Sequence, residues 1–135
     1  MKQCPFCQIV NKQIPALTVY EDRDFMAFLD IYPKVYGHTL VIPKKHYRWV
    51  YDVKPYTKYW QLARQIGLAA LRAFNARWIS FMTVGEEVPH AHIHVLPRTE
   101  ADHQPAVVNF SKIVKLSRNQ LKAIAIRLKQ EMGGV

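Results

Sequence analysis

A run in which histidines alternate with apolar residues, His90-Ala91-His92-Ile93-His94-Val95-Leu96, limits the folds that are open to this chain. Successive side chains of a β-strand point to opposite faces, so the run predicts a strand over about residues 89–96. In such a strand the three imidazoles project from one face, while the apolar residues enter a core. The chain therefore needs a sheet with one apolar face and one face that carries titratable groups.

Short apolar runs elsewhere predict the neighbouring strands. Residues 17–20 and 25–29 flank a polar turn and indicate a hairpin. The β-branched run 38–42 predicts a third strand that ends at Pro43, because proline has no amide hydrogen for the ladder. Residues 78–84 predict one more strand before the histidine run.

Two segments have the patterns of helices. Over residues 56–74 the apolar side chains recur at spacings of three and four, which predicts one long amphipathic helix. Ser117 and Gln120 form a capping-box pattern that begins a second helix, and Gly133 suits its end. We therefore expect the α+β class, with a long central helix and a C-terminal helix packed on an antiparallel sheet. The length of 135 residues predicts a single domain over residues 1–135.

The charge balance favours an anionic partner. The chain has 19 Lys and Arg residues against 10 Asp and Glu residues, a formal net charge of +9. Such an excess attracts nucleotides, RNA or acidic lipids. No long apolar run or secretory signal is visible, so we expect a cytoplasmic protein with no membrane partner. The absence of a Lys/Arg-rich tail argues against nucleic acid as the partner.

Three histidines on one strand face allow two kinds of chemistry. Three imidazoles can bind a catalytic zinc ion and leave a fourth position for an activated water. Alternatively, one imidazole is a nucleophile that its neighbours orient while they bind phosphate oxygens. The histidine run alone leaves both readings open.

The N-terminal Cys4-Pro5-Phe6-Cys7 also has several interpretations. It is half of a zinc site, a dithiol redox motif, or a pair of free cysteines. The redox motif normally follows a strand, and none is predicted here. Structural zinc requires two further ligands, for which His46 and one histidine of the run are candidates.

Four segments, in order, resemble the histidine triad family of nucleotide hydrolases and transferases. They are Cys4-x-x-Cys7 with Ile14-Pro15, the hairpin from Val19 to Asp30, Gly37 to His46, and His90-x-His92-x-His94 with Pro97-Arg98. The resemblance covers about residues 4–98. For residues 99–135 we expect a loop and the C-terminal helix.

The resemblance implies a role for each matching position. His92 attacks the α-phosphorus and becomes nucleotidylated, His94 helps to hold the phosphate, and His38 supports the catalytic face from the next strand. Asp30 binds the ribose hydroxyls, and the base pocket is lined by Phe28 and Ile31.

The resemblance further implies a structural zinc ion and a homodimer built around a shared sheet. The zinc ligands are Cys4, Cys7, His46 and His90, and no organic cofactor is expected. The substrate implied is a purine nucleotide with adenosine as the expected nucleoside: an AMP phosphoramidate, a dinucleoside polyphosphate or a related nucleotide ester. The alternatives are a hydrolase with a catalytic zinc on the three histidines, and a catalytically weak nucleotide-binding scaffold.

The loop before the histidine run departs from the family pattern. Glu86 stands where a neutral glutamine is expected near the leaving group, and Glu87 stands where some branches use a serine to contact phosphate. A carboxylate repels a phosphate. These two residues therefore turn outward, are protonated, or favour a cationic leaving group such as an amine.

Overall fold

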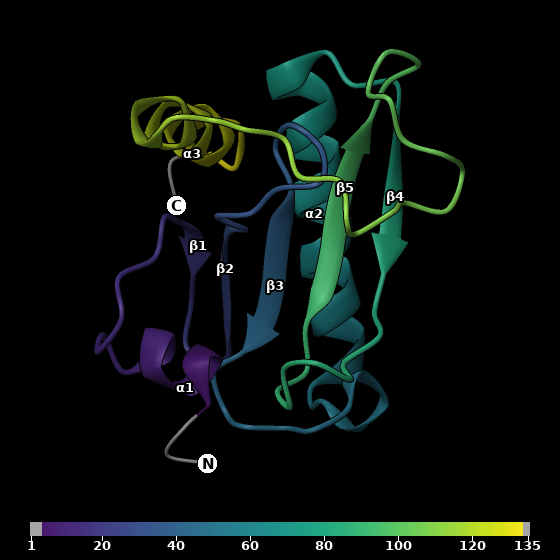
Figure 1. Cartoon of the computed structure of the whole chain (residues 1–135). Helices are drawn as coiled ribbons and strands as arrows, with labels where there is room; N and C mark the ends of the chain where they lie inside the picture. Colours follow the sequence, from purple (N-terminus) through teal and green to yellow (C-terminus); the bar gives the residue numbers. More distant parts are fainter. Residues whose placement is uncertain (1–3, 134–135) are drawn as a thin grey trace.

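The computed structural model describes residues 4–133, which form a five-stranded antiparallel sheet with helices on both faces (Figure 1). Along the chain the elements are α1 (Pro5–Val10), β1 (Thr18–Glu21), β2 (Phe25–Leu29), β3 (Thr39–Pro43), a 3₁₀ turn (Val50–Asp52), α2 (Tyr56–Phe74), β4 (Trp78–Met82), β5 (Ile93–Arg98) and α3 (Arg118–Glu131). The expected α+β class is confirmed. None of the helices within residues 4–133 has the length and apolar character of a membrane span.

The strand order β1-β2-β3-β5-β4 places the histidine run beside the centre of the sheet. Leu40 of β3 lies opposite His94 of β5, and Val41 lies opposite Ile93. Because side chains alternate along a strand, Leu40 and His94 share one face, while Val41 and Ile93 share the other. Strand β4 occupies one edge of the sheet.

Helices α2 and α3 cover the apolar face. The first packs on β3, β5 and β4, and the second packs on β1 and β2. As the spacing predicts, α2 buries one stripe of side chains: Tyr59, Leu62, Ala63, Ile66, Ala69, Ala70 and Ala73. Gly67 allows α2 to approach β4, because a Cβ atom there would lie 3.3 Å from side-chain atoms of Ile79 and Phe81.

The C-terminal helix begins as the capping-box pattern predicts. The Ser117 hydroxyl accepts a hydrogen bond from the Gln120 amide (3.1 Å), and the Gln120 side chain accepts one from the Ser117 amide (2.8 Å). The buried side of α3 consists of Leu121, Ile124, Ala125 and Leu128. These residues join the core formed by α2 and the sheet.

Three features differ from the sequence predictions. Strand β4 ends at Met82, whereas the predicted strand runs to residue 84. Strand β5 begins at Ile93 rather than near residue 89, because the Ala91 amide donates to the Tyr47 carbonyl (2.7 Å), outside the ladder with β3. The Cys-x-x-Cys segment, for which no helix is predicted, starts α1. Cys4 is its N-cap, and its Sγ accepts from the Cys7 amide at 3.4 Å.

A buried tyrosine connects α2 to the centre of the sheet. The Tyr59 hydroxyl, which is fully buried, donates a hydrogen bond to the Val41 carbonyl at 2.9 Å. Tyr59→Phe should therefore lower the free energy of unfolding by about 1–1.5 kcal/mol, because the Val41 carbonyl loses a buried partner. Urea unfolding measures the change. Tyr56→Phe is the matched control, because Tyr56 is exposed on the same helix; equal losses in the two variants would contradict the prediction.

Candidate active site and metal-binding cluster

A cavity of about 620 Å³ lies on the sheet face opposite α2 and α3. Helix α1 and the turn after it form one wall, and the loop between β4 and β5 forms another. His92 and His94 lie at its base, with Phe28 and Leu40 beside them. The cavity thus brings together side chains from the N-terminus, the hairpin, the histidine run and the segment after β5.

His92 presents a nucleophilic nitrogen to this cavity. Its Nδ1–H donates to the His90 carbonyl at 2.7 Å, which leaves the lone pair of Nε2 free. Phe6 packs perpendicular to the imidazole, with 5.1 Å between ring centroids. Burial lowers the pKa of His92 below its ordinary value. The imidazole is therefore neutral near pH 7, as a nucleophile requires.

His38 and His94 form a hydrogen-bonded pair with defined tautomers. The Lys34 amide donates to Nδ1 of His38 (3.1 Å), so Nε2 of His38 carries the proton and donates to Nδ1 of His94 (2.9 Å). Nε2 of His94 is then a hydrogen-bond donor. Burial, with the nearby charges of His92 and Lys34, lowers the pKa of His94 to about 3. The pair is therefore neutral at physiological pH.

The expected substrate-binding residues also line the cavity. Asp30 follows β2, and one carboxylate oxygen accepts from the Tyr32 amide at 2.8 Å. The other oxygen lies 3.7 Å from both the Lys34 ammonium and Nε2 of His38. Phe28 is buried, and Ile31 is exposed at the rim. Sequence reasoning did not identify Lys34, since nothing in its local pattern separates it from a surface lysine.

The loop between β4 and β5 places both unusual carboxylates at the cavity. Glu86 and Glu87 line it, and both residues are exposed to solvent. Gly85 precedes them with a φ of +75°, a conformation that favours glycine. The Arg48 guanidinium donates to the Gly85 carbonyl and lies 3.9 Å from the centroid of the Trp49 ring. Arg48, which sequence reasoning missed, thus holds the loop in place.

The four expected metal ligands converge beside this site. Nδ1 of His90 lies 3.4 Å from Sγ of Cys4, 3.5 Å from Sγ of Cys7 and 3.1 Å from Nδ1 of His46. Nδ1 of His46 lies 3.2 Å from Sγ of Cys7. A tetrahedral zinc ion separates two nitrogen ligands by about 3.3 Å and a nitrogen from a sulfur by about 3.6 Å. The spacing in the cluster is within a few tenths of an ångström of these values.

The tautomer of His90 supports metal binding. Its Nε2–H donates to the Pro43 carbonyl at 2.9 Å, so the lone pair of Nδ1 points into the cluster. Two thiolates and two imidazoles are consistent with zinc and fill all four positions of a structural site. Without metal, burial raises the pKa of the Cys7 thiol to about 11, whereas a redox dithiol needs a depressed pKa.

The three histidines of the run do not converge on one metal. His90 belongs to the cysteine cluster, while His92 and His94 face the cavity. Asp30, His38 and His94 also bring possible ligand atoms together, but the two imidazoles are hydrogen-bonded to each other. The geometry therefore favours a nucleophilic histidine over a metal held by all three.

Comparisons with known proteins show the family of this chain. Residues 11–101 match the HIT domain family model. An uncharacterised HIT-like protein of Methanocaldococcus jannaschii is 35% identical, with 87% of this chain and 95% of that protein covered. The adenosine 5′-monophosphoramidase of Saccharomyces cerevisiae is 30% identical, with coverages of 87% and 80%.

A solved structure extends the likeness to three dimensions. The zinc-bound histidine triad family protein of Mycobacterium smegmatis superimposes with a TM-score of 0.81 at 29% identity, and 98% of this chain and 95% of that chain are covered. The family model, the relatives and the shared fold agree with one another, so this chain belongs to the HIT domain family.

Proposed function

We propose that this protein is a nucleotide hydrolase that works through a covalent nucleotidyl-histidine on His92. The observation that carries the proposal is the His92 tautomer: its Nδ1 is committed to the His90 carbonyl, and its Nε2 faces the cavity. A relative, the yeast adenosine 5′-monophosphoramidase, acts on a substrate of this class. We therefore place AMP phosphoramidates first among the substrates, with dinucleoside polyphosphates and related AMP esters as further candidates.

The reaction has two displacement steps. In the first, the lone pair of Nε2 attacks the α-phosphorus, the N–P bond forms, and the bond to the leaving group breaks. An amine leaving group takes a proton from solvent as it departs. In the second, water attacks the phosphorus and gives a proton to solvent, the N–P bond breaks, and AMP leaves while His92 regains its neutral imidazole. Each of these two steps has a lower barrier than the single direct displacement by water that they replace.

Neighbouring groups stabilise the charge on the phosphoryl oxygens. The Nε2–H of His94 donates to one oxygen, and its orientation is set by His38. The Lys34 ammonium, which is held near Asp30 at 3.7 Å, adds a positive charge at the same end of the cavity. Asp30 accepts from the ribose hydroxyls, and the base lies against Phe28 and Ile31.

We further propose that zinc occupies the cluster of Cys4, Cys7, His46 and His90 and that the chain forms a homodimer. Zinc there supplies folding energy and connects α1 to the catalytic segment. The cytoplasm suits this site, because thiols stay reduced there. Edge strand β4, with Trp78 and Phe81 exposed, supports the dimer.

Substitution of the nucleophile tests the mechanism. His92→Ala should lower kcat/KM for an AMP phosphoramidate by at least about 10³-fold and abolish capture of labelled AMP on the protein. His103→Asn is the matched control, because His103 is exposed, and asparagine tolerates its positive φ. If His92→Ala retained a tenth of the wild-type turnover, the covalent mechanism would be wrong.

Removal of a metal ligand tests the zinc site. His46→Ala or Cys7→Ser should reduce the zinc content of the purified protein and lower its Tm by roughly 10 °C or more, since a structural ion contributes folding free energy. Elemental analysis and thermal melts measure the two effects. His92→Ala should keep its zinc, because His92 is outside the cluster. Native protein without zinc, and with a Tm that a chelator does not change, would refute the assignment.

The carboxylates at the rim should set a preference among leaving groups. A carboxylate stabilises a departing ammonium and repels a departing phosphate, by about 1 kcal/mol at 4 Å in water. The wild type should therefore favour an AMP phosphoramidate over a diadenosine polyphosphate. Glu86→Gln combined with Glu87→Ser should reduce the ratio of the two kcat/KM values about five-fold, chiefly by accelerating the polyphosphate.

Salt and a control substitution complete this test. Because both glutamates are exposed, high salt should narrow the wild-type preference. Glu100→Gln removes an exposed carboxylate outside the cavity and should leave the ratio unchanged. A ratio that the double substitution does not alter would show that Glu86 and Glu87 act only as solvated surface groups.

A further inference from the structure

The segment from residue 99 to residue 117 has neither helix nor strand, yet side-chain hydrogen bonds hold it firmly. Figure 1 shows it in light green, crossing the sheet between β5 and α3. It lies almost entirely beyond the residues that match the family model. We call residues 99–114 of this segment the strap.

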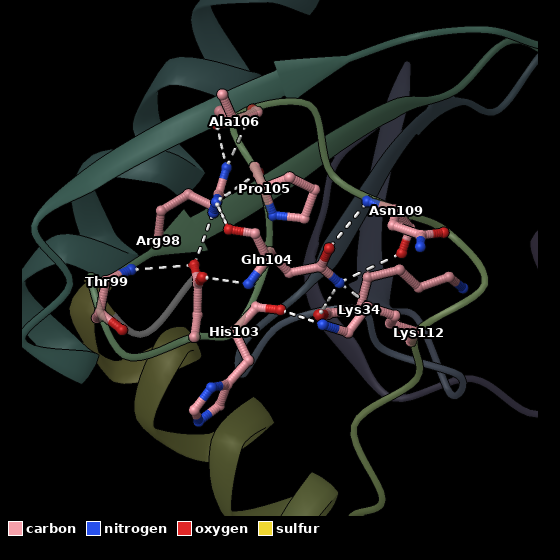
Figure 2. Close-up of polar contacts among 11 residues, drawn as sticks. Lys34, Arg98, Thr99, His103, Gln104, Pro105, Ala106, Asn109 and Lys112 are labelled. Atoms are coloured by element: carbon pink, nitrogen blue, oxygen red, sulfur yellow. Dashed lines mark hydrogen bonds and ion pairs between the residues drawn. The ribbon is translucent and has the colours of Figure 1, made fainter.

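Arg98, the last residue of β5, anchors the strap. Its side chain is almost completely buried, and its Nε donates to the Asp102 carboxylate at 2.6 Å. Its Nη2 donates to the carbonyls of Gln104 (3.2 Å) and Pro105 (2.9 Å). Figure 2 shows the guanidinium at the centre of these contacts. A planar group with five donors is suited to hold several loop carbonyls at once.

Gln104 fastens the strap to the active-site segment. Its Nε2 donates to the Lys34 carbonyl at 2.9 Å, and its Oε1 accepts from the Asn109 amide at 2.8 Å (Figure 2). The Val114 amide adds a bond to the Pro33 carbonyl at 2.7 Å. The strap is therefore tied to the stretch of chain that carries Asp30 and precedes His38.

These hydrogen bonds place Phe110 against His94 and near His38. The Phe110 ring lies perpendicular to the His94 imidazole, with 4.8 Å between centroids, and 6.0 Å from the His38 ring. The Lys34 ammonium lies 5.4 Å from the Phe110 centroid. Phe110 also lines the cavity and packs with Val108 in a small apolar cluster. Perpendicular contact between aromatic rings is a favoured geometry.

We propose that Phe110 is a positioning residue that the strap holds against His94, so that Nε2–H of His94 stays aimed at the phosphoryl group. This inference rests on the proposed function. The contact with His38 fixes one edge of the His94 imidazole, and Phe110 blocks rotation on another side. Its ring also keeps water away from the hydrogen-bonded histidine pair. A fixed donor in a dry site stabilises the transition state more than the ground state.

Protonation of His94 provides a readout that is independent of turnover. The titratable and charged groups around the pair are His92, Lys34 and Asp30. Burial is the main reason that His94 stays neutral in acid. Loss of the Phe110 ring admits water, so the pKa of His94 should rise towards its ordinary value.

The experiment compares Phe110→Ala, Phe110→Leu and Gln104→Ala with the wild type and with Val107→Ala as the control. Val107 lies on the same strap but is 75% exposed. Steady-state kinetics with an AMP phosphoramidate give kcat and KM. Histidine ¹⁵N NMR of the free proteins gives the tautomer and titration midpoint of His94. Thermal melts verify folding.

Phe110→Ala should lower kcat about ten-fold with less than a three-fold change in KM, and raise the His94 midpoint by about one pH unit or more. Phe110→Leu keeps apolar bulk at this position, so its fall in kcat and its rise in the His94 midpoint should both be smaller than those of Phe110→Ala. Gln104→Ala should change kcat and the midpoint in the same direction, although its side chain does not line the cavity. Val107→Ala should match the wild type.

Two results would overturn the proposal. One is an unchanged His94 tautomer and midpoint in folded Phe110→Ala protein. The other is a loss of kcat in Phe110→Ala while Phe110→Leu and Gln104→Ala both keep the wild-type kcat. If Phe110→Ala did not fold, the results for Phe110→Leu and Gln104→Ala would decide alone. The NMR measurement needs no substrate. A wild type without hydrolase activity would refute the proposed function, while the His94 spectra would still test the role of Phe110.

Discussion

The hydrogen bonds of His90 join the features on which this protein depends. Its Nδ1 lies in the cluster of candidate metal ligands, its Nε2–H donates to the Pro43 carbonyl at the end of β3, and its own carbonyl accepts from Nδ1 of His92. The residue that completes the cluster therefore also selects the tautomer of the proposed nucleophile. His90 thus connects α1 to the end of β3 through its side chain. Through its backbone carbonyl, it also sets the direction of the His92 lone pair.

Each of the buried histidines has a hydrogen-bond partner for at least one ring nitrogen. The Lys34 amide, His38 and His94 form one chain of donors and acceptors, and His92 uses the His90 carbonyl. A buried imidazole that gained a second proton would be an uncompensated charge, so burial lowers the pKa of each. The same burial that keeps the rings neutral gives His92 its free lone pair near pH 7.

The sequence predicts the parts of this fold that follow from local periodicity. The alternating runs become strands of one sheet, the spacing over residues 56–74 becomes α2, and the capping box begins α3. Asp30, His92 and His94, which the family pattern predicts together, line one cavity, and His38 is hydrogen-bonded to His94 behind it. Helix α1 was not predicted, since six residues carry little periodic signal and its start depends on Cys4 as a cap.

The sequence does not identify other residues of the site, because contacts between segments that are far apart in the sequence bring them there. Lys34 and Gln104 are 70 positions apart, and their hydrogen bond forms only when the strap folds over the sheet. Arg48 reaches Gly85 across 37 positions. The start of β5 was misplaced for a related reason: an alternating pattern cannot show that the Ala91 amide donates to the Tyr47 carbonyl, outside the ladder with β3. These errors concern long-range geometry rather than residue chemistry.

The segments that flank the matched domain each contribute an aromatic side chain to the cavity. The family model covers residues 11–101, which include the candidate nucleophile and its supporting histidines. Phe6 lies before this range and packs on His92, whereas Phe110 lies after it and packs on His94. The segment that carries Phe6 is attached to His90 through Cys4, and the segment that carries Phe110 is held by Arg98 and Gln104. The shared domain therefore supplies the candidate nucleophile and its histidine partner, and each flank packs one aromatic ring on one of these two imidazoles.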